Sequence, residues 1–200
     1  MKKVLFVFSV LFTSVVSLHA QTTQGTFSLG GGLGVTTDKD EEDGEDTKSS
    51  QFNFTPSVGY FVMDNFMVGA NLSIITGKED DGFGGDDKYS AVFFGPFIRY
   101  YKFTSNEQFA FFGELGTQFG TYKDKPDGLD ETKASAFNFY ISPGLSYFFN
   151  EHWEMDFSFQ AISFSSYDPD KDQDDDKSTT FNFGFQTFSP SIAVRFNFGN

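Results

Sequence analysis

The strongest constraint on the fold of this chain is an alternation of bulky apolar residues with small or polar ones. The segments 27–35, 66–74, 109–117 and 153–161 carry it, and their apolar rows are Phe27, Leu29, Leu33 and Val35; Phe66, Val68, Ala70, Leu72 and Ile74; Phe109, Phe111 and Leu115; Trp153, Met155, Phe157 and Phe159. A period of two residues indicates β-strands, because successive side chains of a strand point to opposite faces. The intervening residues are mostly Gly, Ser, Asn and other polar types, so each predicted strand has one apolar and one polar face.

A second series of four segments is anchored on proline. The segments 52–62, 92–102, 139–149 and 186–196 align on Pro56, Pro96, Pro143 and Pro190, with apolar residues two before, two after and four after each proline. The two series alternate with a repeat of about forty residues, which predicts four hairpins and about eight antiparallel strands. Eight is a permitted number for a membrane barrel. Because proline lacks a ladder donor, we expect a local irregularity such as a bulge at each of these positions.

The connectors between the predicted strands alternate in length. Short ones, residues 63–65, 104–108 and 150–152, lie at one end, and long ones, at about 38–50, 76–88, 123–135 and 165–179, lie at the other. The four long segments hold 22 of the 28 acidic residues. They therefore explain why the chain has a net charge of −14 and a mean hydropathy of −0.31 although its strands are apolar.

The volume of the apolar side chains decides which face points outward. An eight-stranded barrel has an interior just wide enough for side chains or one small ligand, and about thirty large apolar residues do not fit there. Gly, Ser, Ala, Asn and a few charged residues do fit. An apolar exterior is a hazard in water and a requirement in lipid. The sequence therefore predicts an all-β fold, an eight-stranded antiparallel up-and-down transmembrane barrel, with the last strand paired to the first.

The first 20 residues predict an export signal that precedes the barrel at 21–200. Lys2 and Lys3 form a basic start, residues 4–16 are largely apolar, and residues 17–20 offer a cleavage site before Gln21. The apolar run is too short for a spanning helix. We therefore expect an exported protein.

Several classes of function are disfavoured by composition. The acidic net charge argues against nucleic-acid binding, and the absence of Cys excludes disulfides, thiolate metal sites and a cysteine nucleophile. One His, His152, follows the signal, and it stands in a short connector; we therefore expect no catalytic residues, no enzyme activity and no cofactor. Asp168, Asp170, Asp172 and Asp174 alternate, but Gln173 and Thr179 stand where a calcium loop of the EF-hand type needs Gly and Glu, so we expect no metal site.

Aromatic residues gather near the strand ends. Tyr60, Phe66, Tyr100, Phe109, Tyr147 and Trp153 cluster near the short-connector end of the outward face, and Tyr89, Tyr122, Tyr140 and Tyr167 approach the long-connector end. Amphipathic rings favour the headgroup level of a membrane, so two aromatic girdles are predicted.

A small group of charged residues falls on the inward face. Arg99 and Glu114 should lie opposite or diagonal to each other on neighbouring strands, and Glu154, Asp156 and Arg195 add further charges. Ionisable groups in a narrow barrel are expected to pair, which favours a salt-bridged plug; a narrow ion path through the same residues is the alternative. Phe61, Phe97 and Phe112 also fall on this face and favour a filled interior.

In the segment GYFVMDNFMVGANLSI (59–74) and the closing SPSIAVRFNFGN (189–200), the chain resembles the outer-membrane protein β-barrel domain family of Gram-negative bacteria, of the OmpA/OmpX type. The resemblance implies an integral bacterial outer-membrane protein with long extracellular loops and short periplasmic turns. Its expected partners are outer-membrane lipid, lipopolysaccharide and the barrel-assembly machinery, together with an unidentified surface partner. The expected function is structural or surface-interacting through the acidic loops, and the alternative is a narrow porin-like channel for small solutes or ions.

Overall fold

The computed structural model of the chain describes residues 22–42, 45–80, 86–125, 130, 132–169, 177–184 and 191–199. The predicted export signal, Pro190 and the acidic positions Asp170, Asp172 and Asp174 lie outside these residues. Within the described part of the chain, no helix is long and apolar enough to cross a membrane. The strands are β1 (Phe27–Glu42), β2 (Glu45–Met63), β3 (Phe66–Asp80), β4 (Asp86–Phe103), β5 (Phe109–Lys125), β6 (Thr132–Phe148), β7 (Trp153–Ser158), β8 (Ile162–Asp168), β9 (Ser178–Phe183) and β10 (Ser191–Phe198).

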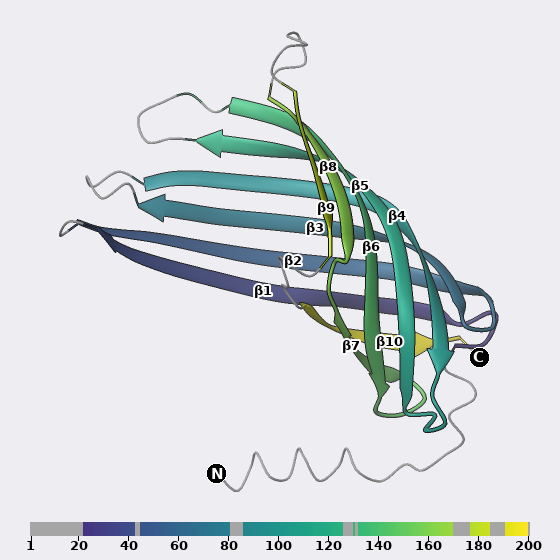
Figure 1. Ribbon diagram of the computed structural model, residues 1–200. Helices are drawn as coiled ribbons and strands as arrows, with labels where there is room; N and C mark the ends of the chain where they lie inside the picture. The colour runs from purple at the N-terminus through teal and green to yellow at the C-terminus, as the bar shows by residue number, and fades with distance from the viewer. Residues whose placement is uncertain are drawn as a thin grey trace, which may run out of the picture.

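These strands form a closed antiparallel barrel of eight spans (Figure 1). β1 to β6 are six continuous spans, each paired with the next. β7 and β8 both pair with β6 and together form the seventh span, while β10 and β9 pair with β7 and β8 and form the eighth. β10 also pairs with β1, from Phe27↔Phe198 to Gly32↔Ala193, and this closes the ring as predicted. Closure removes the open sheet edges that are not tolerated in hydrocarbon.

The short connectors lie where the sequence predicts them, at 64–65, 104–108 and 149–152. In the first, Asn65 has a φ of 63°, a left-handed conformation that asparagine tolerates better than most residues. The segment before β1 packs onto this end of the barrel: Asn65 N donates to Thr22 O at 2.8 Å and Gly25 N donates to Phe61 O at 2.9 Å.

The strands run much further into the predicted long loops than the sequence pattern indicates. Within the segment expected as a loop at 38–50, β1 and β2 are paired in all the described residues, up to Glu42↔Glu45, and β3 and β4 reach Asp80↔Asp86. In Figure 1 the β1–β2, β3–β4 and β5–β6 hairpins project at the end of the barrel opposite the short turns. Backbone pairing, which does not depend on side-chain type, continues here after the apolar alternation has stopped.

The apolar rows face outward. Leu29, Leu33, Val35, Phe94 and Phe111 are 50%, 71%, 75%, 59% and 60% exposed, whereas Ser28, Glu154 and Asp156 on the other face are 0–1% exposed. The predicted orientation of the two faces is thereby confirmed for the described rows, with one exception in the segment 153–161.

The exception is Phe159, which was expected to continue the outward row of Trp153, Met155 and Phe157. It follows the end of β7 and lines an internal cavity instead. β6 passes from β7 to β8 with a one-residue change of register, between Gly144↔Ser158 and Ile141↔Ile162. One extra residue reverses the face on which later side chains lie, so a strict period of two fails here.

That irregularity lies beside Pro143, where Phe159 N donates to Pro143 O at 3.3 Å. The expectation of a bulge at every proline is nevertheless wrong for Pro56 and Pro96. β2 keeps one register with β1 and with β3 across Pro56, and β4 keeps one register with β3 and with β5 across Pro96. The ladder does skip each of these prolines on one side: β2 and β3 have no paired residues between Phe54 and Ser57, and β4 and β5 have none between Phe94 and Phe97. The missing donor is therefore accommodated by a local gap in the ladder without an extra residue.

Candidate functional site in the lumen

The sheet register brings the five predicted lumen charges together. Arg99 on β4 is directly opposite Glu114 on β5, and Arg195 on β10 is directly opposite Glu154 on β7. Asp156 lies two residues beyond Glu154 and therefore on the same inward face. Gly30, opposite Arg195, leaves room for that side chain, because a Cβ at this position would lie 2.5 Å from Arg195 Cγ.

Asp156 is the centre of this charge network. Its Oδ2 accepts from Arg99 Nη1 at 2.5 Å and from Arg195 Nε at 2.8 Å, and its Oδ1 accepts from Ser146 Oγ at 2.6 Å. The side chains of Arg99, Arg195 and Asp156 are 5%, 5% and 2% exposed. A single carboxylate thus holds two buried guanidinium groups from opposite sides of the lumen.

Glu114 and Glu154 complete the pairing of the two arginines. Arg99 Nε donates to Glu114 Oε2 at 2.8 Å, and Arg99 Nη2 lies 2.6 Å from the same oxygen. Arg195 Nε lies 3.7 Å from Glu154 Oε1. The network contains three carboxylates and only two guanidinium groups, so it has a formal excess of one negative charge. Uncharged hydrogen-bond donors stabilise this excess.

Those neutral donors are two tyrosines that the sequence interpretation did not assign to the network. Tyr101 donates to Glu154 Oε1 at 2.9 Å and accepts from Arg99 Nη1 at 3.1 Å. Tyr140 donates to Glu114 Oε1 at 3.0 Å. Parity along the strands would have identified Tyr101, because it lies two residues after Arg99 and so shares its face.

The second predicted girdle is accordingly wrong for most of its members. Tyr140 is 7% exposed and lies in the lumen, Tyr89 donates to Gln51 Oε1 at 3.0 Å, and Tyr122 lines the same internal cavity as Gln51. All three belong to the polar row of their strands, so their side chains point into the lumen and not toward the outward face.

The aromatic residues predicted at the short-turn end do lie at one level of the outward face. The register places four aromatic pairs side by side on neighbouring strands: Phe66 and Tyr100, Phe109 and Tyr147, Tyr60 and Phe27, and Trp153 and Phe196. Neighbouring rings are in contact, at 5.0 Å for Phe109 and Tyr147 and 4.9 Å for Trp153 and Phe196. Their role at a headgroup level stays a prediction.

A layer of apolar side chains occupies the lumen on the short-turn side of the charges. It consists of Phe61, Met67, Tyr101, Ala110, Phe112 and Phe148, all at most 5% exposed. Phe97 packs with this layer from the long-hairpin side of Arg99, and both Phe97 and Phe112 also line the cavity described below. Phe61, Phe97 and Phe112 lie inside the barrel as expected. The Phe112 ring also lies under Arg99, whose Cζ is 4.1 Å from the ring centroid. Charge network and apolar layer therefore pack as one unit.

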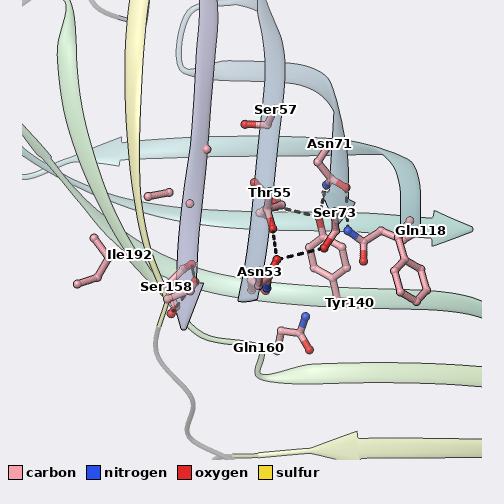
Figure 2. Close-up of a pocket in the computed structure, with 18 of the residues that line it drawn as sticks. Asn53, Thr55, Ser57, Asn71, Ser73, Gln118, Tyr140, Ser158, Gln160 and Ile192 are labelled. Atoms are coloured by element: carbon pink, nitrogen blue, oxygen red, sulfur yellow. Dashed lines mark hydrogen bonds between the residues drawn. The ribbon is translucent and has the colours of Figure 1, made fainter. Parts of the chain in front are cut away.

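On the other side of the charges the lumen is hollow. A cavity of about 900 Å³ extends from Arg99, Glu114 and Arg195 toward Thr36 and Gln51. Most of its wall consists of amide and hydroxyl side chains, several of which bond to one another (Figure 2). The described residues contain no group of His, Asp and Glu arranged to hold a metal ion.

A closed barrel with an apolar exterior, a polar interior and ion pairs across its lumen defines an integral outer-membrane β-barrel protein. Residues 8–187 match the family described as outer membrane protein beta-barrel domain, and the chain belongs to this family. This membership makes it an integral protein of the bacterial outer membrane.

Comparison with solved structures gives similarities at low sequence identity. OprG from Pseudomonas aeruginosa is 16% identical over 90% of this chain and 99% of its own, with a TM-score of 0.49. Neisserial surface protein A is 12% identical over 88% and 98%, with a TM-score of 0.49, and Ail, the attachment invasion locus protein of Yersinia pestis, is 17% identical over 88% and 100%, with a TM-score of 0.46. No curated protein matches the sequence.

Proposed function

We propose that this protein is a non-conducting outer-membrane barrel that has no catalytic cycle and acts structurally or through its acidic hairpins at the cell surface. The observation that carries the proposal is the unit formed by the charge network and the apolar layer beneath it. Asp156 joins arginines from β4 and β10, so the ion pairs bridge the lumen instead of following one wall. The buried aromatic layer supports a dry obstruction on the short-turn side.

The rival function is a narrow channel for small solutes or ions, which the cavity of about 900 Å³ and the lumen charges favour. Conductance of the purified protein in planar bilayers separates the two. We expect no discrete openings for the wild-type protein, and openings for a Tyr101→Ala, Phe112→Ala double variant, which removes two rings from the apolar layer. Reproducible wild-type openings that Arg99→Ala or Glu114→Ala abolishes would contradict the proposal and establish the channel.

The surface role requires the acidic hairpin ends to face outward from the cell and the short turns to face the periplasm. Because the chain has no Cys, single cysteines report orientation without background. We expect a membrane-impermeant maleimide to label Asp124→Cys, at the far end of β5, on intact cells. Ser105→Cys, in the short turn between β4 and β5, should react only after permeabilisation. The reverse pattern would invert the proposed topology.

The partners that we propose for this surface are outer-membrane lipid and lipopolysaccharide, the latter through divalent cations shared with the acidic segments. The barrel-assembly machinery would act during insertion. Replacing the acidic residues of one hairpin at a time by their amides should lower resistance of cells to detergent or reduce surface adhesion. If all four variants match the wild type in both assays, the acidic segments have no such role.

A further inference from the structure

The cavity on the long-hairpin side of the charge network is lined by polar side chains, and neither a plugged lumen nor a surface role of the acidic hairpins requires them. Among its described lining residues only Arg99, Glu114 and Arg195 are charged, and all three are paired at its base. The remaining polar lining is made of neutral side chains, chiefly Asn53, Asn71, Ser73, Gln118 and Asn138. A cavity that only holds water does not require so many side chains that both donate and accept hydrogen bonds.

Two of these amides, Gln118 and Asn71, are held by a chain of hydrogen bonds that continues to Tyr140 (Figure 2). Gln118 Nε2 donates to Asn71 Oδ1 at 2.8 Å, and Asn71 Nδ2 donates to Tyr140 Oη at 3.0 Å. Tyr140 then donates to Glu114, which Arg99 holds. The chain of bonds therefore anchors the cavity wall to the buried ion pairs, and a ligand would meet groups that are already ordered.

The same bonds leave hydrogen-bonding capacity on the cavity side. Asn53 accepts from Thr55 at 3.0 Å and from Ser73 at 3.5 Å, and both bonds end on its Oδ1, so neither uses its amino group. The bond from Gln118 uses Nε2 and not Oε1. An amide group offers a donor and an acceptor side by side, which matches a hydroxyl group that also does both.

Aromatic rings supply the second element of the lining. Tyr122 on β5 is half-buried in the wall, and its ring is held by Phe93 at 5.2 Å and by Tyr167 at 5.7 Å, both in edge contacts. An aromatic body with a polar tip binds ligands that combine C–H faces with hydroxyl groups. The volume of about 900 Å³ lies within the range of roughly 300–1,000 Å³ found for small-molecule sites.

We propose that this cavity binds a neutral carbohydrate, as large as a short oligosaccharide. Amides and hydroxyls on β2, β3 and β5 bond to the sugar hydroxyls, and Tyr122 packs against a sugar ring. A charged ligand is disfavoured because the charged side chains among the described lining residues are already paired, and burial of a further unpaired charge is strongly unfavourable. The proposal goes beyond the proposed function and does not depend on whether the barrel conducts.

The test is isothermal titration of the purified full chain with neutral trisaccharides. Maltotriose, cellotriose and N,N′,N″-triacetylchitotriose are the neutral probes, and trigalacturonate and the glucosamine trimer are their anionic and cationic counterparts. The protein is kept in amine-oxide micelles, because maltoside detergents would themselves present sugar. We expect saturable binding of at least one neutral trisaccharide and much weaker binding of both charged ones.

Two variants locate the site. Gly34 lines the cavity, and a Cβ there would meet only Asn53 Cβ at 3.6 Å, so Gly34→Leu fills the space without disturbing the backbone. It should weaken binding at least tenfold, and Gln118→Leu should weaken it about two- to tenfold, the loss of one hydrogen bond. Val58→Leu, on the outward face of β2, should bind like the wild type.

Heat-dependent gel mobility shows whether each variant is folded. Three results would overturn the proposal: no binding of any neutral probe, equal binding of the charged probes, or full affinity in folded Gly34→Leu. A conducting barrel that still binds a trisaccharide would contradict the proposed function and leave this inference intact.

Discussion

Asp156 is the acceptor that the two lumen arginines share, so its charge determines whether they can lie in one narrow space. Without it, Arg99 and Arg195 would face each other with only Glu114 and Glu154 at their outer sides. A buried ion pair adds little stability over an apolar equivalent, but removal of one member leaves an uncompensated charge. The network is therefore more sensitive to partial than to complete replacement.

We expect Asp156→Asn to lower the free energy of unfolding by about 3–5 kcal/mol, the cost of removing one partner from a buried ion pair. Urea unfolding in lipid vesicles, followed by tryptophan fluorescence of Trp153, measures it. Asp124→Asn, an exposed change on β5, should cost less than about 1 kcal/mol. Equal stability of the two variants would show that the ion pairs do not hold the lumen together.

Tyr101 and Tyr100 are a matched pair of positions for measuring how much a tyrosine hydroxyl contributes to the stability of the barrel. Tyr101 is 1% exposed and bonds to Glu154 and Arg99, whereas Tyr100 is 56% exposed on the outward face. Tyr101→Phe should cost about 1–3 kcal/mol, because it leaves charged groups unsatisfied in the lumen. Tyr100→Phe should leave the same urea midpoint unchanged; a comparable loss in both would mean that the Tyr101 hydroxyl has no special role.

The elements were predictable from the sequence wherever the period of two was unbroken. The rows at 27–35 and 66–74 determine the outward face of β1 and β3, and the turns at 63–65 and 104–108 fix where strands end. The failures have local causes: one extra residue after Ser158 changes the face of Phe159, and paired backbone extends β1 and β2 through acidic sequence. Arg99 and Glu114 could be paired from strand parity, but Asp156 becomes the shared acceptor only because closure of the ring between β10 and β1 brings β4 across the lumen from β7.

The backbones of β4 and β5 approach each other closely at Gly95, so this position should tolerate only glycine. Gly95 precedes Pro96, and a Cβ on it would collide with the backbone carbonyl of Thr117, whereas a Cβ on Gly113 would have nothing within 4 Å. Gly95→Ala should therefore cost about 1–3 kcal/mol or prevent refolding, and Gly113→Ala should be tolerated. The fraction of protein with folded gel mobility after refolding measures both; an equally folded Gly95→Ala would show that β4 and β5 can separate there.

The whole barrel is longer than a membrane is thick. A tilted strand needs about 9–11 residues to cross the hydrocarbon layer, while β1 to β6 have 15 to 19. If the aromatic level at Tyr100 marks the short-turn interface, the crossing part of β4 begins there and Phe94 lies near its middle. The remainder of each hairpin, with most of the acidic residues, then projects beyond the opposite interface.

This placement predicts how the cost of a charge varies along the outward face of β4. Phe94→Arg should lower the free energy of unfolding from lipid vesicles by about 2–4 kcal/mol, the cost of arginine near the bilayer midplane, and Tyr100→Arg by about 0–1 kcal/mol, the cost near an interface. Both residues are similarly exposed, at 59% and 56%, so a barrel surrounded by water would show no such difference. Equal costs at the two positions would contradict the assignment of the aromatic level to the membrane interface, and a larger cost at Tyr100 would shift the crossing segment toward the short turns.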